Sequence, residues 1–395
     1  MLMSLSGIVF GVAFFVVTQA QTAGFQAHFI NTILGVNGMV RVEDRIRSSG
    51  KPLAAEADSA FGVVVAGGVR YIPGIEYPEA LQETIAQIPG VTASSAVIRG
   101  NAVLSANFRE YDCKPHGIDL ASFVAVSDLA KQIVDGSLAA FSENPFGVLV
   151  GIRIANRLKL NVGDSILLQS TTGPVRFRVS AFYETGIEQV DRERVYLHQA
   201  AARSLLNRPV GASFIQIAIT DAALAPEFAE RIEQNTGYYT ASWQEREKTW
   251  IQVFRVLRIS SALTISTIIL ISGLGMFNTL VMIVTEKTRE IAILRSMGYT
   301  RGDISGIFMS LGGIILALGI MLGWVFALVA TYGISRVPIR IRGIFASDHF
   351  IVAWDIAHYI WAAVIATVIV LIASYLPARR AARLEPGDVI RGSST

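Results

Sequence analysis

Three long stretches of the chain lack charged side chains, and they limit the fold more than any other feature of the sequence. They cover Ile259–Thr285, Ile304–Ser335 and Ile356–Ala378, and only the last contains a histidine, His358. A helix needs about 20 apolar residues to cross the hydrocarbon core of a bilayer. Each stretch is therefore predicted to span a membrane rather than to be a buried helix of a water-soluble protein.

The N-terminal segment is a fourth candidate span. Leu2–Val17 is apolar but short, and Thr18-Gln19-Ala20 is similar to the cleavage site of a signal peptide. The segment lacks the positively charged start of a signal peptide, and it contains Gly7 and Gly11 at a spacing that lets membrane helices pack closely. We therefore expect a retained first helix over residues 1–20.

A segment with the charge content of a water-soluble domain separates the first span from the second. Residues 1–40 carry no Asp, Glu, Lys or Arg, residues 41–258 carry 47 in 218, and residues 259–395 carry only 18 in 137. Ordinary soluble domains are about a quarter charged. The expected fold class is an α+β membrane protein with four transmembrane helices and a large mixed α/β extracytoplasmic domain between helices 1 and 2.

Local patterns predict several elements inside this domain. Val175–Phe182 alternates polar and apolar residues and follows Val162–Gln169 across Gly173-Pro174, which indicates a hairpin. The other expected elements are a strand at Phe214–Ile219, proline-initiated helices at Pro78–Ile88 and Pro226–Gln234, and a surface loop at Gly50–Asp58. Asp191–Arg194 is a run of charges and is expected to be solvated.

The positive-inside rule sets the orientation, because cytoplasmic loops carry an excess of Lys and Arg. The 286–303 loop and the tail together carry eight Lys and Arg residues, namely Lys287, Arg289, Arg295, Arg301, Arg379, Arg380, Arg383 and Arg391. The 336–355 loop carries only three, namely Arg336, Arg340 and Arg342. The rule therefore places the 286–303 loop and the tail in the cytoplasm. The predicted order is a first span at 1–20, a periplasmic domain at 21–255, a second span at 256–285, a cytoplasmic coupling helix at 286–303, a third span at 304–335, an outer loop at 336–355, a fourth span at 356–378 and a cytoplasmic tail at 379–395.

Motifs of enzyme and carrier chemistry are missing from the sequence. No P-loop, His-Glu-x-x-His or Gly-x-Ser-x-Gly occurs, and no two of the five histidines have the spacing of a helical metal pair. The spans contain no charged side chain that would mark an ion path, and no basic stripe indicates nucleic acid. The one cysteine, Cys113, excludes an internal disulfide. The chain is therefore expected to have no catalytic residues, cofactor or metal of its own.

The stretch from Thr285 to Tyr299 carries the strongest functional signal. Ile291, Leu294 and Met297 form a narrow apolar stripe at helical spacing, and Gly298 fits a helix end. Such a helix below the membrane suits docking into a groove on a soluble partner. A helix lying on lipid would favour cations alone, whereas here the signs alternate. We expect Ile291 and Leu294 to be the buried anchors of that docking and Glu286, Glu290 and Arg295 its polar contacts. Lys287, Arg289, Met297 and Gly298 complete the predicted coupling site.

Two pairs of glycines predict close helix packing. Gly7 and Gly11 in the first span, and Gly319 and Gly323 in the third, each lie one turn apart on one face. Small residues at this spacing let two helix backbones approach. We expect the first and third helices to pack through these glycines, although glycine is also common in membrane helices in general.

In several places the sequence resembles ABC permeases of the FtsX/MacB superfamily, and within it the lipoprotein-releasing (LolC/LolE-type) permeases most of all. The matching segments are Gly24–Gln26 with Ile33–Val36, Gly151–Asp164, Phe177–Gly186 with Asp191, Trp243, Phe277-Asn278, Glu286-Lys287 with Ile291-Ala292, Leu294-Arg295 and Gly298, and Pro377–Pro386. The resemblance covers almost the whole chain. It implies a MacB-like periplasmic core domain, an inner-membrane location, and a permease pair, of two copies or of a copy and a paralogue. It also implies two separate ATPase subunits that bind the ATP.

The resemblance leaves the cargo open. In the Lol-type permease that hands lipoprotein to its periplasmic carrier, a long hairpin extension separates two strands, whereas here only Ser170–Pro174 lies between them. Either a partner permease supplies that extension or the cargo is not a lipoprotein. The alternatives are an export or efflux permease with another cargo, an FtsX-like signalling protein that controls a cell-wall hydrolase, and a membrane-anchored sensor.

Overall fold

The computed structural model describes residues 2–44, 74–338 and 349–383, and these form two compact units. Among the described residues, a helical unit comprises 2–28, 249–338 and 349–383, and an α/β unit comprises 29–44 and 74–248. Helices α1 (Leu2–Asn37) and α10 (Lys248–Glu286) pass from one unit into the other. The expected loop at 50–58 lies outside the described residues, as do Arg340, Arg342 and Arg391.

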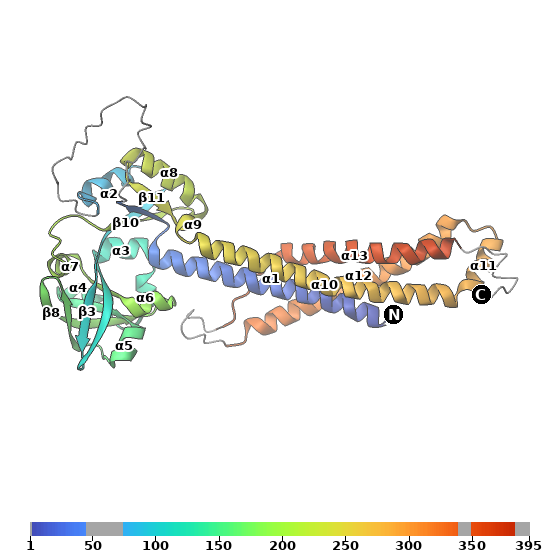
Figure 1. The fold of residues 1–395 in the computed structure, drawn as a ribbon, viewed down its shortest axis with the longest axis horizontal. Coiled ribbons are helices and arrows are strands. Elements are labelled where there is room, and N and C mark those ends of the chain that lie inside the picture. Colours follow the sequence, from blue (N-terminus) through green and yellow to red (C-terminus); the bar gives the residue numbers. More distant parts are fainter. Residues whose placement is uncertain (1, 45–73, 339–348, 384–395) are drawn as a thin grey trace, which may run out of the picture. The chain divides into compact units, whose positions relative to one another are not determined.

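The helical unit confirms the four predicted spanning helices (Figure 1). α1, α10, α12 (Arg301–Ser335) and α13 (Ile356–Ala382) are each long and apolar enough to cross a membrane. α1 continues past residue 20 and α10 begins before residue 256, because the polar residues that flank each apolar run are also helical. The apolar run marks only the part of each helix that suits lipid.

Side chains from all four long helices form one core in this unit. Ile8 and Val12 of α1 are buried with Ile269 of α10, Leu316 of α12 and Ala366 of α13. Lipid tails are as apolar as these side chains, so close van der Waals packing holds such helices together. Hydrogen bonds add to the packing, as between the hydroxyls of Ser4 and Thr279 at 2.9 Å.

The α/β unit is built on a single strand ladder. Its strands are β1 (Val40–Glu43), β2 (Val91–Arg99), β3 (Ala102–Ala106), β4 (Arg109–Ile118), β5 (Ile133–Gly136), β6 (Gly147–Gly151), β7 (Ser165–Ser170), β8 (Gly173–Tyr183), β9 (Arg194–His198), β10 (Phe214–Ile219) and β11 (Tyr239–Ser242). The order β11-β1-β10-β2 forms an antiparallel sheet that continues into β4. Helices α2 (Pro78–Ala86), α3 (Leu120–Val126) and α8 (Ala225–Thr236) pack on this sheet.

The remaining strands close into a barrel. The ladder runs β4-β3-β7-β8-β6-β9, and β9 returns to pair with β4 in parallel, Lys114 opposite Arg194 and Ile118 opposite His198. Inward-facing side chains such as Leu104, Phe177 and Leu197 fill its core. The shorter helices around the barrel and sheet are α4 (Leu138–Glu143), α5 (Ile152–Leu158), α6 (Glu188–Glu193), α7 (Gln199–Leu205), α9 (Trp243–Arg246) and the 3-10 turns Leu129–Gln132 and Ala222–Leu224.

The hairpin, the strand and the two helices predicted in this unit are confirmed. β7 and β8 form the expected hairpin, but Thr171 and Thr172 make the turn, and Gly173 and Pro174, expected there, begin β8. β10 covers the expected strand. α2 and α8 lie where helices were predicted. The chain is therefore an α+β protein with a mixed α/β domain, part of it a barrel, between its first and second spanning helices.

Candidate coupling site

A short helix, α11 (Thr288–Ser296), connects the second and third spanning helices (Figure 1). α10 ends at Glu286, and Lys287 separates it from α11. Gly298 has a φ of 104°, which residues with a side chain rarely adopt, so the helix stops there. Thr300 and Asp303 then cap the start of α12 reciprocally. Local sequence thus fixes the end of α11 and the start of α12.

One face of α11 packs against its own chain. Ile291 and Ala292 are buried, and Leu294 is partly buried beside them. The apolar cluster around Ile291 consists of Val284 of α10, Ile304 and Phe308 of α12, and Ala378 and Ala381 of α13. Arg295 adds a polar link, because its Nη1 donates a hydrogen bond to the carbonyl oxygen of Ala382 at 2.8 Å. α11 is thereby held to the ends of three spanning helices.

The other face of α11 is open. Ile293 is 49% exposed and Met297 is 73% exposed, and they lie one turn apart. Glu286 and Arg289 are exposed as well. Lys287 and Glu290 form an exposed ion pair at 2.6 Å. The surface of α11 is therefore two apolar side chains bordered by charges of both signs.

This arrangement corrects the expected anchors. Ile291 and Leu294 were predicted to be buried in a partner, but Ile291 is already buried inside the chain and Leu294 packs at the same cluster. Met297, expected on the same stripe, lies in the open. Helical spacing shows which side chains share a face, whereas the neighbour that covers that face is decided by the tertiary fold. The apolar side chains available to a partner are Ile293 and Met297.

The four glycines make close contacts, but only half of the predicted pairing is correct. A Cβ on Gly319 would lie 2.7 Å from Ile8 Cγ2 and one on Gly323 would lie 2.9 Å from Val12 Cβ, so α12 does pack closely on α1. Gly7 and Gly11 instead face Ser272 and Ile269 of α10. Ile8 and Val12 are one residue along from these glycines, about 100° around the helix. α1 thus presents glycine to α10 and β-branched side chains to α12.

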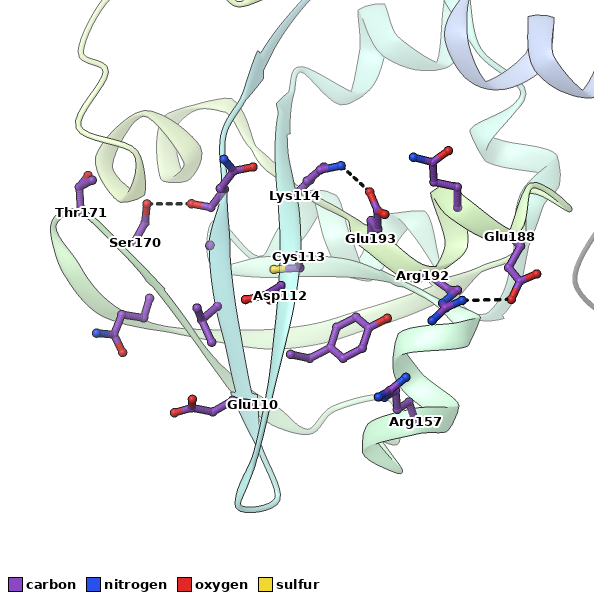
Figure 2. Close-up of a pocket in the computed structure, with 16 residues that line it drawn as sticks. Glu110, Asp112, Cys113, Lys114, Arg157, Ser170, Thr171, Glu188, Arg192 and Glu193 are labelled. Carbon is purple, nitrogen blue, oxygen red and sulfur yellow. Dashed lines mark hydrogen bonds and ion pairs between the residues drawn. The ribbon is translucent and has the colours of Figure 1, made fainter. Parts of the chain in front are cut away.

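Outside the membrane, a groove of about 1480 Å³ lies on the barrel (Figure 2). It is lined by residues of β3, β4, β7, α5 and α6, namely Asn101, Ala102, Val103, Glu110, Tyr111, Asp112, Cys113, Lys114, Arg157, Gln169, Ser170, Thr171, Glu188, Gln189, Arg192 and Glu193. Lys114 pairs with Glu193, and Arg192 pairs with Glu188. Burial raises the pKa of the Cys113 thiol to about 12, so the thiol stays protonated. The groove is a polar surface whose charges largely neutralise one another.

Within the charge run at 191–194, Arg192 and Glu193 are solvated as expected, but Asp191 and Arg194 are not. Asp191 is 2% exposed and accepts hydrogen bonds from Thr185 N at 2.9 Å, Thr185 Oγ1 at 2.8 Å and Gly186 N at 3.3 Å. Arg194 donates to the Asn37 side chain at 3.2 Å and to the Tyr196 hydroxyl. Burial raises the pKa of Asp191 to about 6 although these hydrogen bonds favour its carboxylate. A run of charges in sequence gives no sign of these partners, which lie outside the run and include the distant Asn37.

Arg246 binds the end of α1, a contact that the sequence did not predict. Gly38, with a φ of 67°, ends α1, and the last carbonyl groups of that helix lack helical donors. Arg246 of α9 supplies them, its Nη1 donating to Asn37 O at 3.1 Å and its Nη2 to Gly38 O at 2.7 Å. One guanidinium thus joins the end of α1 to the segment that leads into α10. Only the long sequence separation hid this contact.

Comparison with known proteins assigns both parts of the chain. Residues 1–235 match the model of the MacB-like periplasmic core domain, and residues 262–386 match that of the FtsX-like permease C-terminal region. The lipoprotein-releasing system transmembrane protein LolC of Xylella fastidiosa is 24% identical over 98% of this chain and 92% of its own. The macrolide export ATP-binding/permease protein MacB of Agrobacterium fabrum is 25% identical over 98% of this chain and 58% of its own. The crystal structure of the periplasmic region of MacB from Actinobacillus actinomycetemcomitans aligns at a TM-score of 0.35 and 13% identity, covering 56% of this chain and 96% of that one.

Proposed function

The chain belongs to the FtsX-like permease family and carries a MacB-like periplasmic core domain, and on that premise we propose that it passes ATP-driven motion to that domain. As an ABC transporter permease it is a multi-pass membrane subunit, and its relatives of this kind are not the catalytic subunits. Its family implies an ATPase partner. The proposal assigns the contact with that partner to α11.

The open face of α11 is the observation that carries this proposal. A docking surface of ordinary composition has a small apolar centre and a charged rim that sets register and partner choice. Ile293 and Met297 supply such a centre, and Glu286, Arg289 and the Lys287–Glu290 pair supply the rim. A push on Ile293 reaches α12 and α13 through Ile291, because the two faces belong to one short helix.

ATP belongs to the partner in this proposal. The sequence contains no Gly-x-x-x-x-Gly-Lys-Ser/Thr, whose backbone amides would hold the phosphates. The relative from Agrobacterium fabrum is named as an ATP-binding/permease protein, and this chain covers 58% of it. We infer that the nucleotide site lies on a separate ATPase subunit, and that two permeases, either two copies or a copy and a paralogue, assemble with it. The chain itself needs no cofactor.

The family allows more than one kind of cargo. The similarity to LolC favours a lipoprotein released from the inner membrane. The hairpin between β7 and β8 favours the second candidate, export of another cargo, because its turn is only Thr171 and Thr172 and offers no long extension to a carrier. In a lipoprotein-releasing complex, the paralogous permease would have to supply that extension.

Replacing Ile293 with aspartate tests the coupling role. The change puts a charge at the centre of the proposed contact, and an unpaired buried charge costs about 3–5 kcal/mol, so co-purification with the ATPase should be lost. The purified chain should unfold at the same temperature as the wild type, because Ile293 is exposed in the chain alone. Val210→Asp is the matched control, since Val210 is also exposed but lies in the α/β unit.

Two results would contradict the proposal. Retention of the ATPase by Ile293→Asp at wild-type yield would show that α11 is only a membrane-surface helix. Binding of ATP by the purified chain alone would show that the nucleotide site is not confined to a partner. Ile291→Asp is unsuitable as a test, because Ile291 is buried among α12 and α13 and its loss would damage the chain itself.

A further inference from the structure

The turn between β3 and β4 presents one aromatic ring fully to solvent. β3 ends at Ala106 and β4 begins at Arg109, so Asn107 and Phe108 alone make the turn. The Phe108 side chain is 109% exposed, more than any other large apolar side chain among the described residues. A single exposed apolar residue is common on protein surfaces, so exposure by itself indicates nothing.

The backbone of this turn makes Phe108 unusual. Asn107 has a φ of 50° and Phe108 has a φ of 59°. Two-residue hairpin turns with both φ values positive favour Asn followed by Gly. A bulky residue in this left-handed region is a genuine outlier and costs on the order of 1 kcal/mol or more. Glycine would relieve that strain, so the ring at this position is not explained by folding.

Hydrogen bonds hold the turn against the end of α5. Asn107 Nδ2 donates to Leu158 O at 3.0 Å and to Lys159 O at 3.3 Å. Arg109 Nη1 donates to Arg157 O at 3.1 Å. These bonds satisfy carbonyl groups at the end of a helix. They also hold the backbone of the turn in place, so a partner would meet a turn of fixed backbone geometry.

The surface around the ring is positively charged. The charged residues within 107–110 and 157–159 are three cations, Arg109, Arg157 and Lys159, and one anion, Glu110. Their net charge is +2. All four side chains are exposed. Aromatic rings and arginines are the side chains over-represented at the energetic centres of protein interfaces.

We propose that the turn Asn107–Phe108 is a docking knob that places the Phe108 ring in an apolar pocket, bordered by carboxylates, on a partner protein. The carboxylates would face Arg109, Arg157 and Lys159. A lipid surface fits these observations less well. Membrane-surface elements present a broad apolar face to a fluid interior, whereas here a single ring stands alone on a strained two-residue turn. The proposal stands independently of the role of α11.

A photo-crosslinking phenylalanine analogue tests this contact in cells. p-Benzoylphenylalanine at position 108 of the full chain keeps the ring in place, and the same residue at Val210, which is 61% exposed in the same unit, is the matched control. Irradiation should attach one other polypeptide at position 108 and not at position 210. Lys159→Glu should reduce the adduct several-fold, because the charge reversal opposes the rim. The crosslinked segment of the partner identifies the neighbouring carboxylate on that partner. Replacing that partner carboxylate with lysine should restore crosslinking to Lys159→Glu and weaken crosslinking to the chain with Lys159.

Phe108→Gly then separates docking from folding. Glycine accepts the positive φ, so the variant should unfold at the wild-type temperature or above it. Loss of an aromatic anchor should weaken capture of the partner identified by crosslinking on the order of 30-fold, and Phe108→Trp should retain it. The proposal is overturned if position 108 crosslinks to lipid, to a second copy of this chain or to nothing. It also fails if the charge exchange has no effect or if Phe108→Gly captures the partner as well as the wild type.

Discussion

Replacing Gly323 with alanine should loosen α12 from α1. The added Cβ would lie 2.9 Å from Val12 Cβ and Cγ1 and 3.1 Å from Val9 O. Carbon atoms in contact are normally about 3.5–4.0 Å apart, so the helices must separate by several tenths of an ångström. Neither neighbour can yield easily, because Val12 is fully buried and β-branched and Val9 O belongs to the backbone.

Gly313 offers a matched control on the same helix. A Cβ there meets nothing within 4 Å among the described residues. Both substitutions gain the same helix propensity, roughly 1 kcal/mol in soluble helices, so the difference between them reports packing alone. Overpacking a filled core costs roughly 1–3 kcal/mol. Gly323→Ala should therefore be less stable than Gly313→Ala by about that amount, and Gly323→Leu should be worse still.

The measurement is thermal unfolding of the detergent-purified chain, followed in parallel for the wild type and the three variants. If Gly323→Ala and Gly313→Ala unfold at the same temperature, the α1–α12 contact is not close-packed at this point and the reasoning is refuted.

Three further predictions concern the α/β unit. Burial raises the pKa of Asp191 from 3.8 to about 6, so the folded state holds this proton more tightly than the unfolded state. The free energy of unfolding should therefore fall as pH rises from about 4 to 6 and then level off, and Asp191→Asn should flatten that slope in thermal melts across this range. Arg246→Met should destabilise the domain by about 2 kcal/mol or more, since two carbonyl groups lose a charged donor. An unchanged unfolding temperature would show that these two hydrogen bonds do not stabilise the end of α1. Cys113, buried and with its pKa raised to about 12, should react with maleimide only after denaturation, so rapid labelling of the native protein would disprove its burial.

Sequence alone determined the elements that depend on local pattern and length. Three apolar runs long enough for a bilayer and a shorter one at the N-terminus predict four spanning helices, whatever the rest of the chain does. The alternation in Val175–Phe182 and the turn signal Gly173-Pro174 predict that hairpin, because strand period and turn residues are local properties. The short helix α11 and its end near Gly298 were predicted for the same reason. The family resemblance, too, could be read from the order of short motifs.

The tertiary structure decided which surfaces meet. The barrel closes only because residues 114–118 pair with residues 194–198, a contact that no local pattern records. Ile291 turned inward and Ile293 outward because α12 and α13 cover one side of α11, and Gly7 faces α10 rather than α12 for a similar reason. Asp191 is buried by partners that a solvated charge run would not have. Helical and strand periods define the faces of an element, but long-range packing selects the neighbour for each face.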